Sequence, residues 1–250
     1  MDAKQLLQSL IAEVYDYNVV YKYLDFDGAV AMLTNSNLQF TRADHLNDDL
    51  DCNIDSIIDF SALKAFDFDP SFKLQYREKL KNEIGQCGIL SVAKSYNNKC
   101  LWEGYSRSGM QDDVVCIELN PKRIIQELGK PLFQVHYFKN PSNCIPIEWL
   151  FPESGIYAKN LFFSQFYTTK YQWNASQTKC WELEDELRFI NVEPQVDPFY
   201  RISVPFDFFQ TVYIKKNMPK ELQDKLKQCS RQKNNIRIID KIAFLVELKK

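Results

Sequence analysis

Glycine is scarce in this sequence, with 7 copies among 250 residues. Loops that cradle phosphate groups need closely spaced glycines so that the backbone can approach the phosphates, and the chain contains neither GxGxxG nor GxxxxGK[ST]. This scarcity argues against a glycine-rich dinucleotide loop and against a P-loop.

Patterns typical of metal sites, disulfide frameworks and nucleophilic enzymes are missing as well. The two histidines, His45 and His136, lie far apart, and the seven cysteines form no CxxC pair. Zinc sites usually combine closely spaced Cys and His ligands, and disulfide frameworks usually have an even number of cysteines. There is no GxSxG motif, and neither histidine accompanies a recognisable nucleophile. We therefore expect no metal and reduced thiols.

The chain also lacks a long apolar run and a strong net charge. No segment approaches the roughly 18 consecutive apolar residues of a membrane-spanning helix, and the N-terminal stretch has no apolar signal region. The net charge of −2 provides no electrostatic reason to expect nucleic acid as a partner. These features predict a cytoplasmic protein that does not bind membranes.

What is present fits a soluble globular protein, with 45% hydrophobic and 26% charged residues. The patterns predict a single α+β domain over residues 1–250, with a mixed, mostly antiparallel sheet, flanking helices and an N-terminal helix within residues 1–17. We expect helices at residues 4–15, 25–37, 154–169 and 219–233, and helical structure with an interruption between residues 52 and 84. We expect strands at residues 18–24, 87–95, 114–120, 131–139, 186–192 and 200–206, and a short strand that begins at residue 38 and runs into a polar loop. The strands 186–192 and 200–206 are expected to pair.

The segment KCWELEDELRFINVEP, residues 179–194, is unusually acidic and contains an arginine. In a strand, alternate residues share a face, so Glu184, Glu186 and Arg188 are expected on one side. The core side would then carry Leu183, Leu187 and Phe189. On these residues alone, a solvated face with an internal ion pair is the favoured reading. The alternative is a cleft in which Arg188 holds a carboxylate by a bidentate pair.

The segment HLNDDLDC, residues 45–52, is a second polar cluster. Asn and Asp side chains commonly bond to nearby backbone N–H groups in turns and helix caps, and this structural role is favoured. A functional reading makes Asn47 or Asp48 a polar wall of a cleft. A hard cation is a further alternative, although the calcium-loop spacing with its glycine is absent.

Two further clusters of candidate site residues contain aromatic side chains. Trp102 and Tyr105 follow the strand that contains Ser91, and aromatic residues at this spacing usually belong to the core. In a cleft they could instead enclose a planar ring. Lys22 alternates with two tyrosines and should lie on the opposite face of its strand, either solvated or as a partner for phosphate.

Taken in this order, the clusters resemble the bacterial domain-of-unknown-function 2971 family. The stretch from VVYKYLD to HLNDDLD resembles the family's opening, with Asn47 and Asp48 in place and Asp49 where the family has proline. GILSVAKSYNNKCLWEGYS and WELEDELRFI resemble two later motifs. The residues that carry them are Ser91, Trp102, Tyr105, Trp181, Glu184, Glu186 and Arg188.

The layout is also similar, more distantly, to ADP-ribosyltransferases, which have a basic first strand, a serine or tyrosine in a middle strand and a late Glu-x-Glu. The chain departs from that pattern at Lys22, where those enzymes have Arg or His. The resemblance implies an ADP-ribosyltransferase-like fold, NAD as co-substrate and Glu186, or Glu184, as catalytic residue. The binding residues it implies are Lys22, Tyr23, Asn47, Ser91, Trp102, Tyr105 and Arg188.

The leading hypothesis is therefore an NAD-consuming enzyme that transfers ADP-ribose to an unknown macromolecular target or hydrolyses NAD. A non-catalytic domain that binds a nucleotide-like ligand or a protein, in a bacterial stress or phage-defence system, is the alternative. A metal-dependent hydrolase that uses the NDDLD acids is a third possibility.

Overall fold

The computed structural model describes residues 17–46, 51–60, 69–105, 113–138, 145–151, 155–171, 181–229 and 235–239. Its main sheet has nine strands in the order β11-β2-β4-β1-β5-β12-β13, with β10 paired to β4 and β6 paired to β10. The strands are β1 (Val20–Asp25), β2 (Asn37–Arg42), β4 (Gly88–Ala93), β5 (Val114–Leu119), β6 (Leu132–Gln134), β10 (Glu186–Asn191), β11 (Phe199–Ser203), β12 (Phe209–Lys215) and β13 (Asn235–Ile239). Every pairing in this sheet is antiparallel except that of β12 with β13.

Two small parallel sheets lie beside the main one. They pair β3 (Ile58–Asp59) with β8 (Ile145–Pro146) and β7 (His136–Phe138) with β9 (Thr169–Tyr171). The helices are α2 (Phe26–Asn35), α3 (Ile54–Ile57), α5 (Pro70–Gly85), α6 (Lys99–Gly104), α7 (Pro121–Leu128), α8 (Gly155–Thr168) and α9 (Lys220–Cys229). The prediction of an α+β fold with a mostly antiparallel sheet is confirmed.

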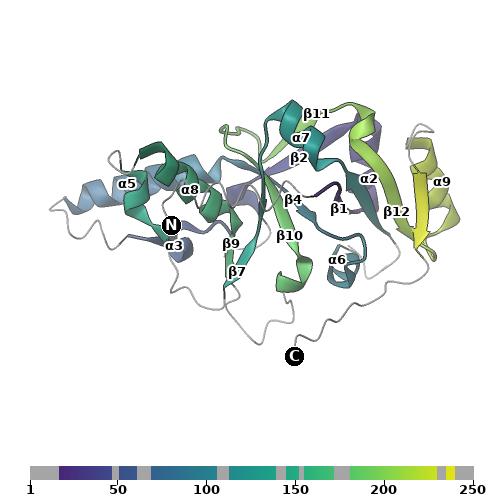
Figure 1. Ribbon diagram of the computed structural model, residues 1–250, viewed down its shortest axis with the longest axis horizontal. Helices are drawn as coiled ribbons and strands as arrows, with labels where there is room; N and C mark the ends of the chain where they lie inside the picture. The colour runs from purple at the N-terminus through teal and green to yellow at the C-terminus, as the bar shows by residue number, and fades with distance from the viewer. Residues whose placement is uncertain are drawn as a thin grey trace.

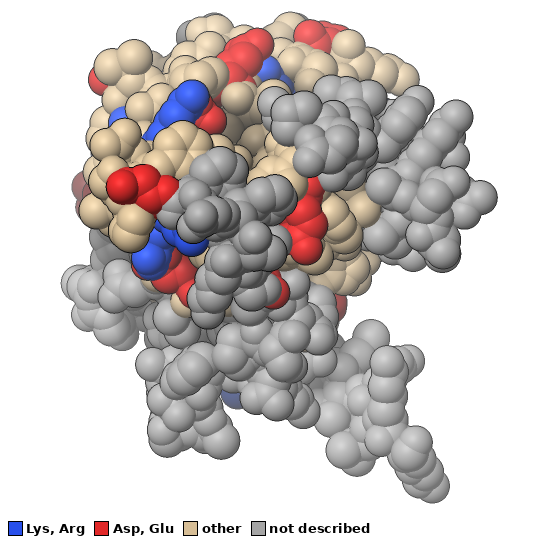
Figure 2. Space-filling view, turned by 90° about the vertical axis from the view of Figure 1, so that its left-hand side faces the viewer, with Lys and Arg blue, Asp and Glu red and all other residues tan. Residues whose placement is uncertain are grey.

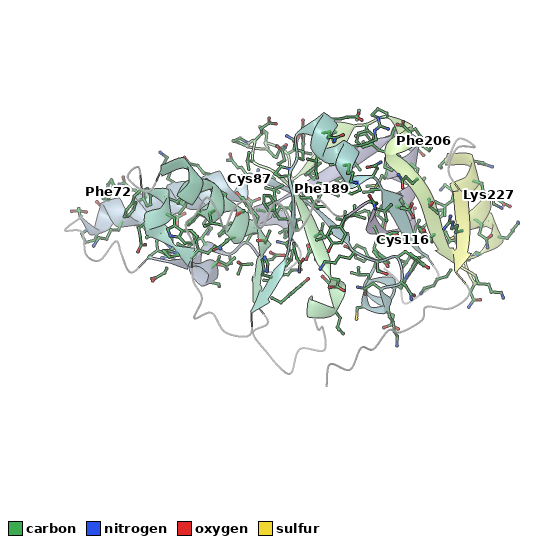
Figure 3. The ribbon with its side chains drawn as sticks, viewed as in Figure 1. Phe72, Cys87, Cys116, Phe189, Phe206 and Lys227 are labelled. Carbon is green, nitrogen blue, oxygen red and sulfur yellow. The ribbon has the colours of Figure 1, made fainter. Side chains whose placement is uncertain are left out.

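Helices α2, α7 and α9 cover one face of the main sheet, on the right in Figure 1. Asp25 begins α2 by accepting a hydrogen bond from the Gly28 amide at 2.7 Å, and Ser36 ends the helix in the left-handed conformation. The helix thereby buries Phe26, Met32 and Leu33 against the sheet. Leu187 and Phe189 of β10 lie in the same core, as predicted, and Figure 3 labels Phe189 near the middle of the molecule.

A second core lies at the other end of the molecule, between α3, α5 and α8 (Figure 1). It is built from Phe162, Phe166 and Tyr167 of α8 together with Leu80 and Ile84 of α5. A third, aromatic core forms where α6 packs on β1, β5 and β12. The second core contains Phe133, which pairs with Arg188 of β10, and the third contains Ala93, which pairs with Glu186. Both cores therefore reach the strand that carries the candidate site.

The predicted pairing of residues 186–192 with 200–206 is wrong. β10 pairs with β4 and β6, whereas β11 pairs with β2. Every residue of β10 is buried, so the strand needs neighbours on both edges, whereas β11 is largely exposed and suits the edge of the sheet. The core position predicted for Leu183 is also wrong, because this side chain is exposed.

Several expectations fall outside the described residues. They include the helix expected within residues 1–17 and the positions of Asn47 and Asp48. Within the described part of the chain, no helix has the length and apolar character needed to cross a membrane. The surface in Figure 2 carries basic and acidic side chains interspersed, with no broad patch of one sign among the coloured residues.

The cysteines that the structure describes are free thiols. They are Cys52, Cys87, Cys100, Cys116 and Cys229. Figure 3 shows Cys87 and Cys116 in different parts of the molecule, in agreement with their separate hydrophobic cores.

Candidate functional site

Arg188 lies at the centre of a buried ion-pair network at the start of β10. Its Nη1 and Nη2 donate to Asp51 Oδ1 and Oδ2 at 2.8 and 2.5 Å, and its Nε donates to Glu186 Oε1 at 2.8 Å. Nη1 also donates to the Tyr167 carbonyl at 2.7 Å, and Nη2 to Glu186 Oε2 at 3.3 Å. All five N–H donors of the guanidinium therefore have protein acceptors. The bidentate pair that was the alternative to a solvated face is present, with Asp51 as the partner carboxylate, and the guanidinium has no donor left for a ligand.

Glu186 is the carboxylate that this arginine shares with a lysine. Lys170 Nζ donates to Glu186 Oε2 at 2.8 Å, and the Glu186 side chain is almost fully buried. Burial opposes its charged form, but Arg188 and Lys170 outweigh that effect and hold the pKa of Glu186 well below its usual range. Glu186 is thus a fixed negative charge in a site shielded from water, rather than part of the solvated face favoured from its sequence alone.

Lys170 connects three carboxylates. Besides Glu186, its Nζ lies 3.6 Å from both Asp51 Oδ2 and Glu184 Oε2. Burial disfavours its charge, but Glu186 and Asp51 outweigh that effect and raise the pKa of Lys170 above its usual value. No sequence pattern singled out this lysine, because only the pairing of β9 with β7 brings it to the start of β10.

Glu184 reaches the same network by a backbone turn and not by strand alternation. It lies in a short 3-10 helix, Trp181–Glu184, and Asp185 follows with a φ of 49°, a left-handed conformation that Asp tolerates better than most residues. The expected strand geometry of Glu184 is therefore corrected, although its carboxylate does lie beside Glu186. Its side chain is 22% exposed, and burial, opposed by Lys170, raises its pKa above the usual value.

Lys22 extends from β1 to the edge of β4. Its Nζ donates to the Ser91 carbonyl at 2.9 Å, at the part of β4 between its pairings with β2 and β1. This is the one hydrogen bond of the ammonium among the described residues. Burial lowers the pKa of Lys22 to about 8, and Glu186 and Glu184 oppose that shift. Lys22 therefore lies within the electrostatic reach of both glutamates and has donors to spare.

Tyr105 lies next to Lys22, whose Nζ is 6.0 Å from the centre of the tyrosine ring. Burial and the negative charges of Glu186 and Glu184 raise the pKa of Tyr105 to about 12, so its hydroxyl is neutral and able to donate. No described residue forms a hydrogen bond with this hydroxyl. Tyr137 lies on the other side of the network, where its hydroxyl accepts a hydrogen bond from the Glu186 amide at 3.3 Å.

Two residues expected to bind a ligand are instead part of the aromatic core. Trp102 has no exposed surface, and its Nε1 donates to the Tyr96 carbonyl at 2.7 Å. Tyr23 packs edge-on against Trp102, and its hydroxyl donates to the Ser95 carbonyl at 2.8 Å. Stacking on a ligand requires an open ring face, so Trp102 fits the core role that its spacing favoured and is not retained as a ligand-binding residue.

The structure thus brings together Lys22, Ser91, Tyr105, Glu184, Glu186 and Arg188 from the predicted set, and leaves Tyr23 and Trp102 in the core behind them. The residues that sequence reasoning did not assign to the site are Lys170, Tyr137 and Asp51. Asp51 belonged to a recognised acidic cluster, but its partner Arg188 was not predictable from local sequence.

The described residues contain no group of three or more His, Cys, Asp and Glu side chains placed to hold a metal ion. Asp51, from the acidic NDDLD stretch, directs both carboxylate oxygens to Arg188. Both oxygens therefore already accept hydrogen bonds from a guanidinium. Asp51 thus provides no support for the hypothesis of a metal-dependent hydrolase, which would need its oxygens as metal ligands.

No protein-family model and no curated protein matches the chain, so the resemblance to the domain-of-unknown-function 2971 family is unsupported. Solved structures of DarT from Thermus sp. 2.9 do align with it. The complex with NAD+ has a TM-score of 0.42 and 8% identity, and the alignment covers 92% of this chain and 98% of that chain. The complex with carba-NAD+ has a TM-score of 0.40 and 9% identity, covering 90% and 96%.

A third DarT structure, in complex with ADP-ribosylated ssDNA, aligns with a TM-score of 0.41 and 9% identity, covering 91% of this chain and 96% of that chain. These values describe a distant likeness between chain traces. The expectation from net charge that nucleic acid is not a partner finds no support in these comparisons.

Proposed function

We propose that the protein consumes NAD by cleaving the bond between nicotinamide and ribose, and transfers ADP-ribose to an acceptor or to water. The observation that carries this proposal is the placement of Lys22 beside β10. Its Nζ bonds the Ser91 carbonyl and lies 6.0 Å from the Tyr105 ring centre, and Ser91 pairs with Arg188 of β10, where Lys170 joins Glu184 to Glu186. This placement supplies a cation for phosphate, a neutral hydroxyl and two carboxylates in one neighbourhood. The ordered motifs that resemble ADP-ribosyltransferases suggest NAD as the ligand that such a combination would bind.

The reaction requires a fixed negative charge. When the bond from ribose C1 to the nicotinamide nitrogen breaks, the electron pair leaves with nicotinamide and positive charge develops on the ribose. A carboxylate already oriented in a site poor in water stabilises that charge without reorganising. Glu186 has these properties, because Arg188 and Lys170 fix both its oxygens and keep it ionised.

The second carboxylate would serve the acceptor. As the acceptor oxygen bonds to ribose C1, its proton must leave, and Glu184 is the more exposed carboxylate of the pair. Its pKa is shifted upward while that of Glu186 is shifted downward, and such a separation is typical of two carboxylates with different roles. We assign Glu184 as the proton acceptor and Glu186 as the electrostatic stabiliser.

Binding would use the groups that have hydrogen-bonding capacity left. The Lys22 ammonium, bonded to the Ser91 carbonyl, would approach the pyrophosphate as a point charge. The Tyr105 hydroxyl would donate to the nicotinamide ribose or to the nicotinamide amide. Ser91 would line this part of the site, whereas Arg188 would act only by holding Asp51 and Glu186.

The test is nicotinamide release from NAD by the purified protein and three variants, Glu186→Gln, Glu184→Gln and Glu103→Gln. Glu103 is an exposed glutamate of α6 paired with Lys99, and so controls for the loss of one charge. Removing one electrostatic stabiliser from an active site costs roughly 100- to 1,000-fold in rate. We expect losses of that order for Glu186→Gln and Glu184→Gln and none for Glu103→Gln. Equal release by all four proteins contradicts the assignment.

A binding domain without turnover is the second candidate, and one observation favours it. Both oxygens of Glu186 already accept hydrogen bonds from Arg188 and Lys170, and the residue is only 6% exposed. A buried network whose charged groups all have partners is also what a purely structural core requires. Calorimetry with NAD separates the two functions, because binding heat without nicotinamide release indicates a binding domain.

A further inference from the structure

We infer that Lys170 is the positioning residue that assigns different tasks to Glu184 and Glu186. The inference deepens the proposed function and rests on it for the reaction, although the geometry does not depend on the identity of the ligand. Lys170 lies outside the motifs that suggested a site and is itself only 6% exposed. It holds the two carboxylates in one fixed arrangement and does not need to touch the substrate to do so.

The distances single out this lysine. Its Nζ lies 2.8 Å from Glu186 Oε2 and 3.6 Å from Glu184 Oε2. Arg188, the other buried cation, contacts Glu186 and Asp51, and its five donors are all engaged. In the described part of the chain, Lys170 is therefore the cation in ion-pair contact with both glutamates.

The fold holds Lys170 from two directions. It is the second residue after the end of α8, and the Tyr167 carbonyl near the end of that helix accepts a hydrogen bond from Arg188. Its strand β9 pairs with β7 so that Lys170 lies opposite Tyr137. The Tyr137 hydroxyl in turn accepts from the Glu186 amide. The lysine and the first residue of β10 are thus linked through backbone as well as charge.

The physical consequence concerns two carboxylates that share one site. Like charges in close contact favour a state in which one carboxylate keeps a proton, unless a cation compensates them. Without Lys170, Glu186 keeps Arg188 whereas Glu184 loses its ion-pair partner. The titratable and charged groups that face this lysine are Asp51, Glu184, Glu186, Arg188, Tyr105 and Tyr137. Its carboxylate partners also face Cys52 and Lys22. Of these, Glu184 has the least other compensation, so it should take up the proton.

The experiment compares the wild type with Lys170→Met, Lys170→Arg and Lys130→Met. Lys130 is a mostly buried lysine that bonds Asn191 near the other end of β10, so it is a matched control away from the site. The first measurement is a carbon-13 NMR titration of the glutamate carboxyl groups without any ligand. We expect the titration of the Glu184–Glu186 pair to move upward by about one to three pH units in Lys170→Met. It should stay near wild type in Lys170→Arg and Lys130→Met.

The second measurement is the pH profile of nicotinamide release. The acidic limb should move to higher pH in Lys170→Met, with a lower kcat and little change in KM, and return in Lys170→Arg. If no form releases nicotinamide, the proposed function fails, while the NMR titration still judges Lys170. If Lys170→Met does not fold, Lys170→Gln replaces it as the uncharged variant in both measurements. An unchanged carboxyl titration in either folded, uncharged variant overturns the inference.

Discussion

Arg188 and Asp51 meet through two parallel hydrogen bonds, of 2.8 and 2.5 Å, although 137 positions separate them in sequence. The pair joins the segment before α3 to the third residue of β10, and both side chains are buried. A bidentate pair of this kind fixes orientation as well as charge. The orientation of Glu186, which the same guanidinium holds, therefore depends in part on a residue from a distant segment of the chain.

Removing Asp51 should strongly destabilise the protein. Asp51→Ala leaves the Arg188 guanidinium buried without its main partner, and breaking one side of a buried pair costs about 3 to 5 kcal/mol. Denaturant unfolding would measure the loss. Asp55→Ala is the control, because the Asp55–Arg77 pair is exposed and should contribute no more than about 1 kcal/mol.

The double variant Asp51→Ala with Arg188→Met tests the reason for that loss. In Asp51→Ala the guanidinium keeps Glu186 but buries two donors that have lost their acceptor, and Arg188→Met removes those donors. The double variant should therefore recover part of the stability lost in Asp51→Ala. A double variant that is less stable than Asp51→Ala would show that the buried donors left by Asp51 are not the main cause of the loss.

Lys22 should make the protein less stable at neutral pH. Burial lowers its pKa to about 8 in the folded protein from 10.5, so the unfolded chain binds the proton more tightly. The free energy of unfolding should then rise with pH from about 8 to 10.5. Lys22→Met should be more stable than wild type at pH 7 by about 1 to 3 kcal/mol, with the difference fading above that window.

Unfolding measured from pH 7 to 11 checks this expectation. Lys122→Met, which removes an exposed ammonium on α7, provides the control for a change in net charge. A stability difference between Lys22→Met and wild type that does not vary with pH would contradict the role assigned to burial.

Trp102 should matter for stability and not for ligand contact. Trp102→Phe leaves a cavity in the aromatic core and removes the hydrogen bond to the Tyr96 carbonyl, so we expect a loss of about 2 kcal/mol. NAD affinity, measured by calorimetry under conditions where the protein remains folded, should be unchanged. A stable Trp102→Phe protein with weakened NAD binding would restore the ligand-stacking role.

The end of α2 provides a stability test remote from the site. Ser36 has a φ of 47°, a left-handed conformation that costs a residue with a Cβ about 1 kcal/mol relative to glycine. Ser36→Gly should therefore raise the free energy of unfolding by about 1 kcal/mol. Gly129→Ala at the end of α7, where φ is 63°, should lower it by a similar amount.

The Gly129→Ala variant separates backbone strain from steric clash as the cause of a stability loss, because a Cβ at this position would meet no atom within 4 Å. Any loss in Gly129→Ala then comes from backbone conformation and not from a clash. Thermal or denaturant unfolding of both variants gives the comparison, and equal signs for the two changes would refute it.

The sequence was sufficient for features that depend on short-range pattern. The apolar alternation of Leu187 and Phe189 predicted a strand with one core face, and the Asp25 cap with its apolar stripe predicted α2. The pairing of β11 was not predictable in this way, because any two strands with compatible patterns can pair, and the choice depends on which edge must be buried.

The residues of the candidate site also fall into those that local sequence could identify and those that only the tertiary structure revealed. Glu184, Glu186 and Arg188 could be identified as candidates because they are neighbours in sequence, and their chemistry is visible in their side chains. Only the tertiary structure showed that Arg188 directs all its donors to protein acceptors and that Lys170 contacts both glutamates. It also decided between the two roles left open for Trp102, in favour of the core role that its spacing indicated. The physical reason is that the charge state and availability of a side chain depend on its burial and on partners from distant strands, which no local spacing records.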